Sequence, residues 1–369
     1  MSDRLKRLFT EFGQSPWLDN LKRGYITSGE LTRIRESGIR GLTSNPTIFQ
    51  KAIQGSDDYT NQFKSLVIQK SNALESYWEL VLQDIHGALD VFAPLYESSD
   101  GSDGFVSVEV DPGLAHDEQQ TLQAARMLHQ RIARNNVMIK IPATIEGIPA
   151  FRTMIGEGRN VNVTLIFSLE RYQDVMNAYI EGLETLSVTQ PSKLAEVASV
   201  ASFFISRVDT DIDRLLEKNG SEDALALRGT AAIAQAKLAY QMFTGTFSGP
   251  RWERLASLGA NLQRPLWAST STKNPAYPDT MYVDQLIGPN TVNTLPDMTV
   301  GAFSDHGNLA TTIDKDVDRA HEQWAQLATH GIDVVDVAAR LEREGVASFQ
   351  KSFDELIGVL AAKVAEMGQ

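Results

Sequence analysis

The chain has 369 residues, 42% of them hydrophobic, so it is long and apolar enough to bury a sizeable core. Its 34 basic and 47 acidic side chains give a net charge of -13, which argues against a nucleic-acid or membrane surface as partner. The absence of cysteine excludes disulfides, thiolate nucleophiles and cysteine-based metal sites. The charged amino-terminal segment is unlike a signal peptide, and no stretch approaches the roughly 20 apolar residues of a membrane span, so we expect a cytoplasmic protein.

Along the chain, short apolar runs typical of strands alternate with longer stretches of helical periodicity. The predicted strands are Ser15–Leu21, Ile39–Asn45, Gly104–Asp111, Asn136–Ala143, Asn160–Phe167, Val197–Ile205, Pro265–Thr270 and Met281–Ile287. The predicted helices between them are Asp58–Phe92, Ala115–Arg134, Ile148–Gly156, Leu169–Leu183, Asp209–Lys218 and Gly229–Phe243. Eight alternating strands favour a closed (β/α)8 barrel. The alternative is an open doubly wound sheet, but the glycine-rich phosphate loop typical of that fold is missing.

The end of the chain, Val334–Met367, is rich in Ala, Leu, Val, Glu and Lys at helical spacing. It predicts one or two helices that pack across the barrel. Glu97–Gly104 and Thr244–Pro250 have the composition of loops, and no low-complexity segment divides the chain. We therefore expect an α/β fold in which residues 1–369 form a single TIM barrel domain, with residues 333–369 as a C-terminal helical extension.

One lysine, Lys140, interrupts the run Asn136–Ala143, which otherwise reads as a buried strand. Burying an ammonium group is costly unless the group is paired or loses its proton. A neutral amine can attack a carbonyl, so Lys140 is a candidate nucleophile. The alternative is a lysine near a strand end whose stem packs while its ammonium group reaches water.

Side chains alternate between the two faces of a strand, which indicates the residues that share the face of Lys140 or the corresponding face of other strands. In several predicted strands one face is apolar and the other has one or two polar groups. These polar groups are Asp19, Asn45, Glu109, Lys140, Asn162, Thr164 and Ser202, with Thr43 on the face of Asn45 and Phe204 on that of Ser202. Each alone could be a satisfied core group or a helix cap. Together, near the carboxyl ends of barrel strands, they predict a site for covalent chemistry on a polyhydroxylated carbonyl compound.

A metal or nucleotide site is not expected. The six histidines show no ligand spacing, and Asp209–Asp213 departs from a calcium loop because Arg214 stands where that loop needs glycine. These acids are better read as the start of a helix, where the helix dipole favours negative charge. Gly156–Gly158 lacks the third glycine of a dinucleotide fingerprint and is read as a turn.

Several motifs resemble those of a known family. Gly41–Phe49 resembles the first transaldolase signature, and Val137–Gly147 resembles the second, which surrounds the Schiff-base lysine. Val108–Asp111, Asn162–Ser168 and Ser202–Arg207 occur in the order that the family uses. The resemblance runs from about residue 19 to residue 274, most of the chain.

The resemblance implies a (β/α)8 enzyme similar to class I aldolases, working without metal or cofactor through a lysine imine. It would transfer a dihydroxyacetone unit from sedoheptulose 7-phosphate or fructose 6-phosphate to glyceraldehyde 3-phosphate or erythrose 4-phosphate. These reactions belong to the non-oxidative pentose phosphate pathway. Sugar phosphates are therefore the expected partners, and the chain would be a monomer or a homodimer.

The resemblance also implies the role of each catalytic residue. Lys140 would attack the ketose carbonyl and form the imine. Glu109, with Thr164 and a bound water, would move protons during imine formation. Asp19 would take the proton of the C4 hydroxyl, so that the C3–C4 bond breaks.

Substrate-binding residues follow from the same resemblance. They are Thr43, Asn45, Asn162, Ser202 and Phe204, of which Asn45, Asn162 and Ser202 would bind donor hydroxyls. The phosphate-binding residues would be Arg207, Ser271 and Lys273. Two positions depart from the better-known branch of the family, since Phe203 replaces a proline and Lys273 falls where a second arginine is expected.

Two other functions stay open. One is an aldolase that releases dihydroxyacetone instead of transferring it. Aldolase-like relatives are shorter and have Tyr where this chain has Phe204 and Gln where it has Glu109, which favours the transferase. The other is a non-catalytic barrel that binds sugar phosphates. Such a barrel would tolerate the loss of Lys140, Glu109 or Asp19, and all three are present.

Overall fold

The computed structural model describes residues 3–367. Eight parallel strands follow one another around a closed barrel, and β8 pairs with β1 to complete the ring. The strands are β1 (Gln14–Leu18), β2 (Leu42–Thr43), β3 (Val106–Glu109), β4 (Val137–Pro142), β5 (Val161–Ile166), β6 (Ser199–Phe204), β7 (Gln263–Ala268) and β8 (Thr291–Leu295). The predicted (β/α)8 barrel is therefore confirmed. None of the helices in the described part of the chain is long and apolar enough to cross a membrane.

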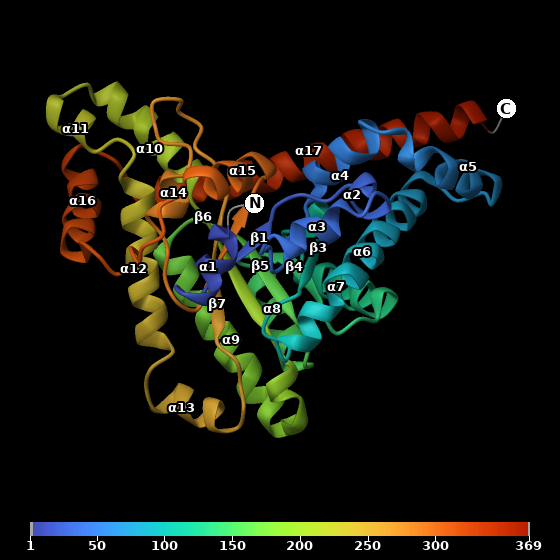
Figure 1. Ribbon diagram of the computed structural model, residues 1–369, viewed down its shortest axis with the longest axis horizontal. Coiled ribbons are helices and arrows are strands. Elements are labelled where there is room, and N and C mark those ends of the chain that lie inside the picture. The colour runs from blue at the N-terminus through green and yellow to red at the C-terminus, as the bar shows by residue number, and fades with distance from the viewer. Residues whose placement is uncertain (1–2, 368–369) are drawn as a thin grey trace.

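Helices fill the connections between strands and surround the barrel (Figure 1). Before β3 these are α1 (Arg4–Thr10), α2 (Arg23–Thr27), α3 (Glu30–Glu36), α4 (Pro46–Gln54), η1 (Asp57–Tyr59), α5 (Thr60–Ile68) and α6 (Ala73–Ser98). Between β3 and β6 they are η2 (Pro112–Leu114), α7 (Glu118–Ile132), α8 (Gly147–Gly156), α9 (Leu169–Thr189) and η3 (Pro191–Glu196). After β6 they are α10 (Ser206–Asn219), α11 (Glu222–Ala226), α12 (Ala231–Thr246), α13 (Pro250–Ser257), α14 (Met281–Asp284), α15 (Asp297–His306), α16 (Val317–Thr329) and α17 (Val334–Met367).

The predicted eighth strand is wrong. Met281–Ile287 begins with the short helix α14, and its buried side chains Tyr282, Val283 and Leu286 recur at helical rather than alternating spacing. The eighth strand is Thr291–Leu295, directly after a turn at Asn290 with φ of 58°. It contains two threonines and an asparagine, so it lacks the apolar pattern by which a strand is predicted from the sequence. These polar residues are tolerated because the interior face of the strand lines a cavity.

The predicted helix over Asp58–Phe92 is interrupted. Lys70 has a φ of 62°, which ends α5, and Asn72 then caps α6. The Asn72 side chain accepts a hydrogen bond from the Glu75 N–H at 2.9 Å, and the Glu75 carboxylate accepts one from the Asn72 N–H at 3.0 Å. This reciprocal capping box explains a new helix start inside an apparently continuous helical pattern.

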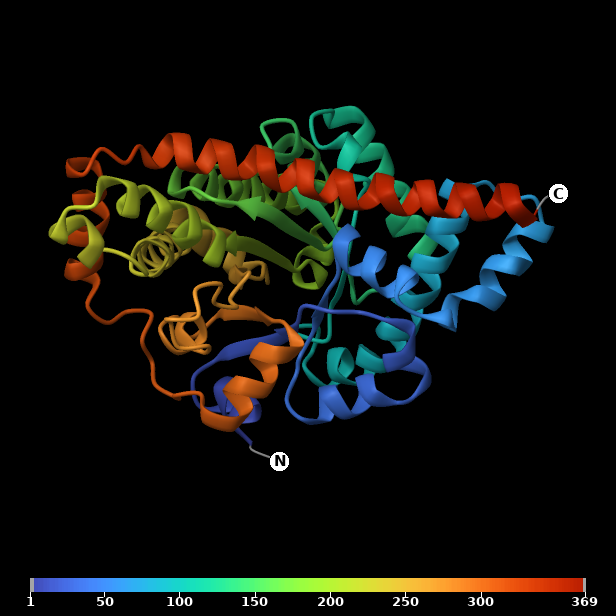
Figure 2. The same cartoon turned by 90° about the horizontal axis from the view of Figure 1, so that it is seen from above.

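The last helix, α17, confirms the predicted C-terminal helical stretch as one continuous helix. It runs across almost the whole width of the molecule (Figure 2) and packs against α4, α6, α10 and β5. Gly345 allows a close approach, since a Cβ atom there would lie 3.0 Å from Leu165 Cδ2 and 3.6 Å from Arg207 Nη1. The helix therefore lies directly over the carboxyl ends of strands β5 and β6.

The strand register brings polar side chains of neighbouring strands together. The apolar faces predicted from alternation are buried, with Val108 and Ile139 at most 1% exposed. On the opposite face, Glu109 of β3 pairs in register with Lys140 of β4, and Lys140 pairs with Asn162 of β5. Three adjacent strands thus present a carboxyl, an amine and an amide side by side, and these define the floor of the candidate site.

Candidate active site

A cavity of about 390 Å³ opens at the carboxyl ends of the strands, the end at which barrel enzymes bind substrates. Of the residues predicted from the sequence, it is lined by Asp19, Thr43, Asn45, Lys140, Thr164, Ser202, Phe204, Arg207, Ser271 and Lys273. Glu109 and Asn162 lie beneath this lining and contact it through Lys140 and Ser202. The structure therefore gathers the predicted set in one place.

Lys140 is buried at the bottom of the cavity, with 5% of its surface exposed. Its Nζ lies 3.3 Å from Glu109 Oε2 and donates a hydrogen bond to the Ser44 carbonyl oxygen at 3.2 Å. The contact with Glu109 is an ion pair, and Glu109 Oε2 accepts no hydrogen bond from any group in the described part of the chain. The amine is therefore held by a neighbouring carboxyl and one carbonyl while it still faces the cavity.

Glu109 and Thr164 offer polar atoms on either side of Lys140. Burial raises the pKa of the Glu109 carboxyl, although the charge of Lys140 opposes the rise. Within residues 3–367, Thr164 Oγ1 is buried and makes no hydrogen bond, like Glu109 Oε2. A carboxylate oxygen in contact with the amine and a buried hydroxyl that makes no hydrogen bond are suited to exchanging protons with a bound substrate group.

The position of Thr164 depends on a bulge in β5. The register between β5 and β6 shifts between Val163 and Ile166, and Leu165 has a φ of 60°. A left-handed conformation is unfavourable for a leucine and is tolerated where the surrounding structure holds it in place. Here α17 packs on Leu165 at Gly345. The strict alternation predicted for this strand therefore ends at Thr164.

Asp19 follows β1 and is held by its neighbours. Its Oδ1 accepts a hydrogen bond from Thr43 Oγ1 at 2.9 Å, and the Thr43 hydroxyl lies 3.2 Å from that of Thr294. Burial raises the pKa of the Asp19 carboxyl, while Lys140, the Thr43 hydroxyl and the more distant cations of the cavity counteract the rise. The result is a fixed carboxyl that can accept a proton in an enclosed site.

The predicted amides take part in supporting hydrogen bonds. Ser202 Oγ donates to Asn162 Oδ1 at 2.7 Å, and Asn162 Nδ2 donates to Ser107 Oγ at 3.1 Å. Asn162 has no exposed surface, so its observed contacts orient Ser202, whose hydroxyl lines the cavity. Asn45 caps α4 by accepting a hydrogen bond from the Ile48 N–H at 3.0 Å. The cap fixes where α4 starts at the cavity edge.

The outer part of the cavity is cationic. The Arg207 guanidinium lies 5.3 Å from the centre of the Phe204 ring and 5.8 Å from that of Phe349, so two aromatic rings position it. Lys273 Nζ donates to Ser271 Oγ at 2.7 Å. Burial lowers the pKa of both Arg207 and Lys273. Neither side chain has a carboxylate within 4.0 Å in the described structure, which suits an anionic ligand.

Two acids of α10 anchor the loop that contains Ser271 and Lys273. Tyr277 donates its hydroxyl proton to Asp213 Oδ2 at 2.6 Å, and Tyr282 donates to Asp209 Oδ2 at 2.9 Å. Asp209 Oδ1 also accepts a hydrogen bond from the Ala232 N–H at 2.7 Å. Burial raises the pKa of Asp209 to about 7. The acidic run that the sequence placed at a helix start therefore ties the loop to α10, which begins beside Arg207.

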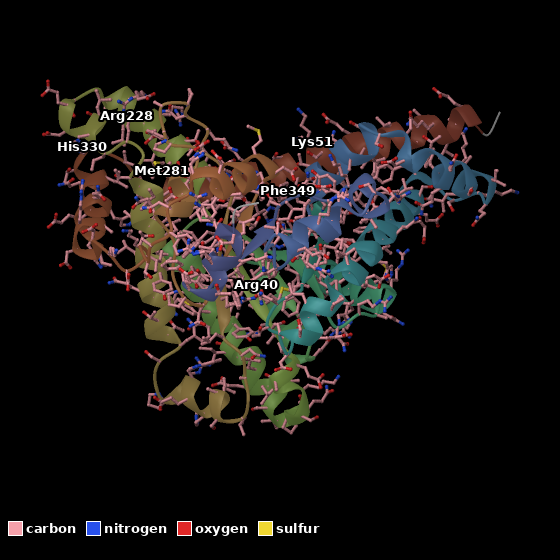
Figure 3. The ribbon with its side chains drawn as sticks, in the orientation of Figure 1. Arg40, Lys51, Arg228, Met281, His330 and Phe349 are labelled. Carbon is pink, nitrogen blue, oxygen red and sulfur yellow. The ribbon has the colours of Figure 1, made fainter. Side chains whose placement is uncertain are left out.

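Nine residues that line the cavity were not singled out from the sequence as site residues. They are Thr47, Ile48 and Lys51 of α4, Ala268 of β7 with the following Ser269, Thr294 of β8 with the later Pro296, and Ser348 and Phe349 of α17. Lys51 and Phe349 both lie on the side of the molecule where α4 meets α17 (Figure 3). The α4 residues could have been found, because a cap and a proline at the start of a helix fix which later positions share one face. Those of α17 had no such signal.

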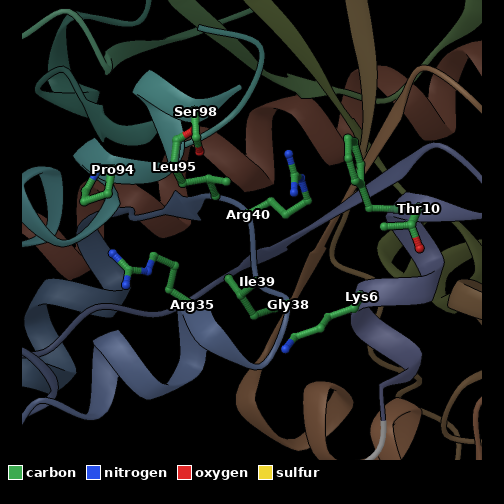
Figure 4. A pocket seen from close by; sticks show the side chains of 10 residues that line it. Lys6, Thr10, Arg35, Gly38, Ile39, Arg40, Pro94, Leu95 and Ser98 are labelled. Carbon is green, nitrogen blue, oxygen red and sulfur yellow. The ribbon is translucent and has the colours of Figure 1, made fainter. Parts of the chain in front are cut away.

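A second hollow, of about 410 Å³, is lined by residues of α1, α3 and α6 and of the segment before β2, and shares no lining residue with the first cavity (Figure 4). Lys6, Arg35 and Arg40 line it, but Arg40 Nε already donates to the buried Asp103 at 2.6 Å. Its lining contains no carboxyl and no buried amine. No group of three His, Cys, Asp or Glu side chains in residues 3–367 is arranged to hold a metal ion.

A closed (β/α)8 barrel with a buried lysine and two carboxyls at its carboxyl end has the features of the lysine-dependent barrel aldolases. The chain belongs to the transaldolase/fructose-6-phosphate aldolase family, whose model matches residues 16–360.

Full-length relatives give the same result. The chain is 47% identical over 350 residues to a transaldolase of Parafrankia sp. (strain EAN1pec), covering 94% of this chain and 95% of the relative. It is 44% identical over 370 residues to a transaldolase of Frankia alni, covering 100% and 99% of the two chains. It is 45% identical over 367 residues to a transaldolase of Thermobifida fusca, covering 99% of each. The resemblance found in the motifs is confirmed, and so is the prediction of an enzyme of the transaldolase type.

Proposed function

We propose that this protein transfers a dihydroxyacetone unit between sugar phosphates through an imine on Lys140. The donor is sedoheptulose 7-phosphate or fructose 6-phosphate, and the acceptor is glyceraldehyde 3-phosphate or erythrose 4-phosphate. The observation that supports this most strongly is the buried amine of Lys140, 3.3 Å from Glu109 in a cavity that Asp19 also lines. The reactions belong to the non-oxidative pentose phosphate pathway, and we expect the enzyme to act in the cytoplasm.

Imine formation uses Lys140 and Glu109. Transfer of a proton from Lys140 to Glu109 leaves a neutral amine, and the raised pKa of the buried Glu109 carboxyl favours this transfer. The amine then adds to C2 of the ketose. Glu109, with Thr164 as hydrogen-bond partner, returns the proton to the departing hydroxyl, so that one water leaves and a protonated imine remains.

Carbon–carbon cleavage uses Asp19. Its carboxylate takes the proton of the C4 hydroxyl, the C3–C4 bond breaks, and the electron pair moves into the protonated imine. An aldose phosphate leaves as the aldehyde, and the three-carbon enamine stays bound to Lys140. In the reverse direction the enamine attacks the acceptor aldehyde, Asp19 returns the proton to the new hydroxyl, and water releases the product from the lysine.

Two features favour transfer over release of free dihydroxyacetone. The relatives that match over almost the whole chain are transaldolases. In addition, Phe204 lies at the cavity with its ring 5.0 Å from that of Phe167, and it lacks the phenolic hydroxyl that the aldolase-like relatives have at this position. A site without that hydroxyl has fewer groups to protonate the enamine, so the enamine survives until an acceptor arrives.

A product assay tests the proposal. The protein is incubated with fructose 6-phosphate and erythrose 4-phosphate, and sedoheptulose 7-phosphate and free dihydroxyacetone are both measured by mass spectrometry. We expect sedoheptulose 7-phosphate in clear excess and its formation to depend on the acceptor. Dihydroxyacetone as the main product at the same rate with or without acceptor would identify an aldolase instead.

A further inference from the structure

Lys51 stands at the mouth of the cavity on a helix whose start is fixed. Asn45 caps α4 and Pro46 occupies its first turn, so later side chains of the helix have defined directions. Thr47, Ile48 and Lys51 recur at spacings of three and four residues and all line the cavity. One face of α4 is therefore a wall of the site, and Lys51 is the charged residue of that wall.

Three cations from separate elements meet at this mouth. Arg207 comes from α10, Lys273 from the loop after β7, and Lys51 from α4. None of the three forms an ion pair within 4.0 Å in the described part of the chain. The carboxyls that act electrostatically on Arg207 or Lys273 are Asp19 and Glu109, which belong to the reacting centre, and the exposed Glu344, which acts on Arg207.

This grouping is unusual for an acidic protein. The chain has a net charge of -13, so a surface cation usually finds a carboxylate. Here Lys51 and Arg207 both act electrostatically on Lys273 and lower its pKa further, after the larger effect of burial. Unpaired like charges held close together repel each other, and an anion between them removes that repulsion.

We propose that Lys51 is a further phosphate-binding residue, which holds the phosphate of donor and acceptor sugars together with Arg207 and Lys273. This inference rests on the proposed function, because the reaction supplies the phosphorylated ligands. A lysine binds phosphate as a flexible point charge, whereas an arginine fork prefers one orientation. The two donors, fructose 6-phosphate and sedoheptulose 7-phosphate, differ by one carbon in the distance between the reacting carbonyl and the phosphate. A flexible lysine such as Lys51 can follow the phosphate to both positions.

The test compares Lys51→Gln with the matched control Lys218→Gln. Lys218 is an exposed lysine of α10 outside the cavity lining, so both variants lose one formal charge from a helix surface. For Lys51→Gln we expect KM for fructose 6-phosphate and for erythrose 4-phosphate to rise about tenfold, as for one lost charge-assisted hydrogen bond. We expect kcat to change less than about twofold, because the contact is the same in ground and transition states.

A second readout isolates the anion. Inorganic phosphate should inhibit wild-type enzyme competitively, and its inhibition constant should rise by the same factor in Lys51→Gln as KM does. Lys51→Arg should restore most of the affinity, since it keeps the charge. Lys218→Gln should behave as wild type in every measurement.

If wild type is active and Lys51→Gln has the same KM and the same phosphate inhibition as wild type, the proposed role of Lys51 is overturned. The proposed function of the enzyme is not affected by that result. A lower kcat at unchanged KM would also overturn the role of Lys51, because that result indicates a role in the chemical step. If wild type forms no transfer product, the proposed function fails, and direct titration with inorganic phosphate still decides the role of Lys51. Weaker phosphate binding in Lys51→Gln than in Lys218→Gln supports it, and equal binding overturns it.

Discussion

Lys140 Nζ lies 3.3 Å from Glu109 Oε2, and the two residues pair in register on neighbouring strands. Both are buried, so neither charge is well solvated. Burial raises the pKa of Glu109, which increases the tendency of this carboxyl to hold a proton. The strand register thus places the Lys140 amine and the Glu109 carboxyl within reach of each other, as the proposed mechanism requires.

The first prediction concerns Glu109→Gln. The amide keeps the size of the side chain but cannot exchange protons, so kcat should fall about a hundredfold or more, as for loss of a general acid–base group. Pre-steady-state trapping should show that imine formation itself has slowed. Glu97→Gln removes an exposed carboxyl of α6 and should have no effect. A Glu109→Gln enzyme with normal imine formation would remove Glu109 from this step.

The second prediction separates imine formation from bond cleavage. Asp19→Asn cannot take the C4 proton, so turnover should fall by at least about a hundredfold while the imine still forms. With fructose 6-phosphate and borohydride, the variant should give an adduct that keeps all six carbons of the sugar, whereas wild type gives one of three carbons. A three-carbon adduct in the variant at the wild-type rate would contradict the role of Asp19.

A partner of Asp19 provides a graded test. Thr43 donates the 2.9 Å hydrogen bond that orients the Asp19 carboxyl. Thr43→Val keeps the shape and removes the donor, so kcat should fall about tenfold, less than in Asp19→Asn. The adduct should then be a mixture of six-carbon and three-carbon species.

The third prediction concerns the ratio of the two activities. Phe204→Tyr adds a hydroxyl within the cavity, where it can help to protonate the enamine. The ratio of free dihydroxyacetone to transfer product should therefore rise, by about tenfold. Phe349→Tyr adds a hydroxyl elsewhere in the same cavity and is the control for polarity alone. Equal ratios in the two variants would argue against a specific role for position 204.

The fourth prediction is a pH dependence of stability. Asp209 has a pKa of about 7 in the folded protein and an ordinary value of 3.8. Below about pH 4 both the folded and the unfolded state bind the proton. Between about pH 4 and pH 7 only the folded state keeps it, so the folded state loses stability as the pH rises, and the loss is complete above pH 7.

Asp209→Asn should remove this loss. The amide stays neutral and keeps an oxygen for the Ala232 N–H, so the melting temperature of the variant relative to wild type should rise from pH 4 to pH 7. The melting temperature of the variant should gain a few degrees over that of wild type, which corresponds to a free energy of unfolding higher by on the order of a few kcal/mol. Asp174→Asn, at an exposed position of α9, should show no such trend. A constant or falling difference for Asp209→Asn would indicate that Asp209 is ionised in the folded state.

Most of the barrel could be predicted from the sequence because seven of its strands have the alternation or the continuous apolar run of a buried strand. The exception was β8, where Thr291, Asn293 and Thr294 have the polarity of a loop. Their side chains hydrogen-bond inside the barrel instead, as between Thr270 Oγ1 and Asn293 Oδ1 at 2.9 Å. Such long-range satisfaction of polar groups is not visible in a local pattern.

The site was predictable where it lies on strands and less so where helices complete it. Alternation located Glu109, Lys140 and Thr164, since each lies near the end of a strand. Lys51 and Phe349 come from helices whose docking over the barrel depends on tertiary contacts, such as the packing of Gly345 on Leu165. The structure also gives Asn162 a supporting contact with Ser202, which alternation alone cannot distinguish from a contact with substrate.

The most direct test of the account is to trap the imine. Wild-type protein is incubated with fructose 6-phosphate without acceptor, reduced with borohydride, digested and analysed by mass spectrometry, with Lys140→Met as the control. We predict a reduced three-carbon adduct on the peptide that contains Lys140, and none in Lys140→Met. An adduct on another lysine, or no adduct in a folded protein that binds the sugar phosphate, would contradict the central claim that Lys140 is the nucleophile.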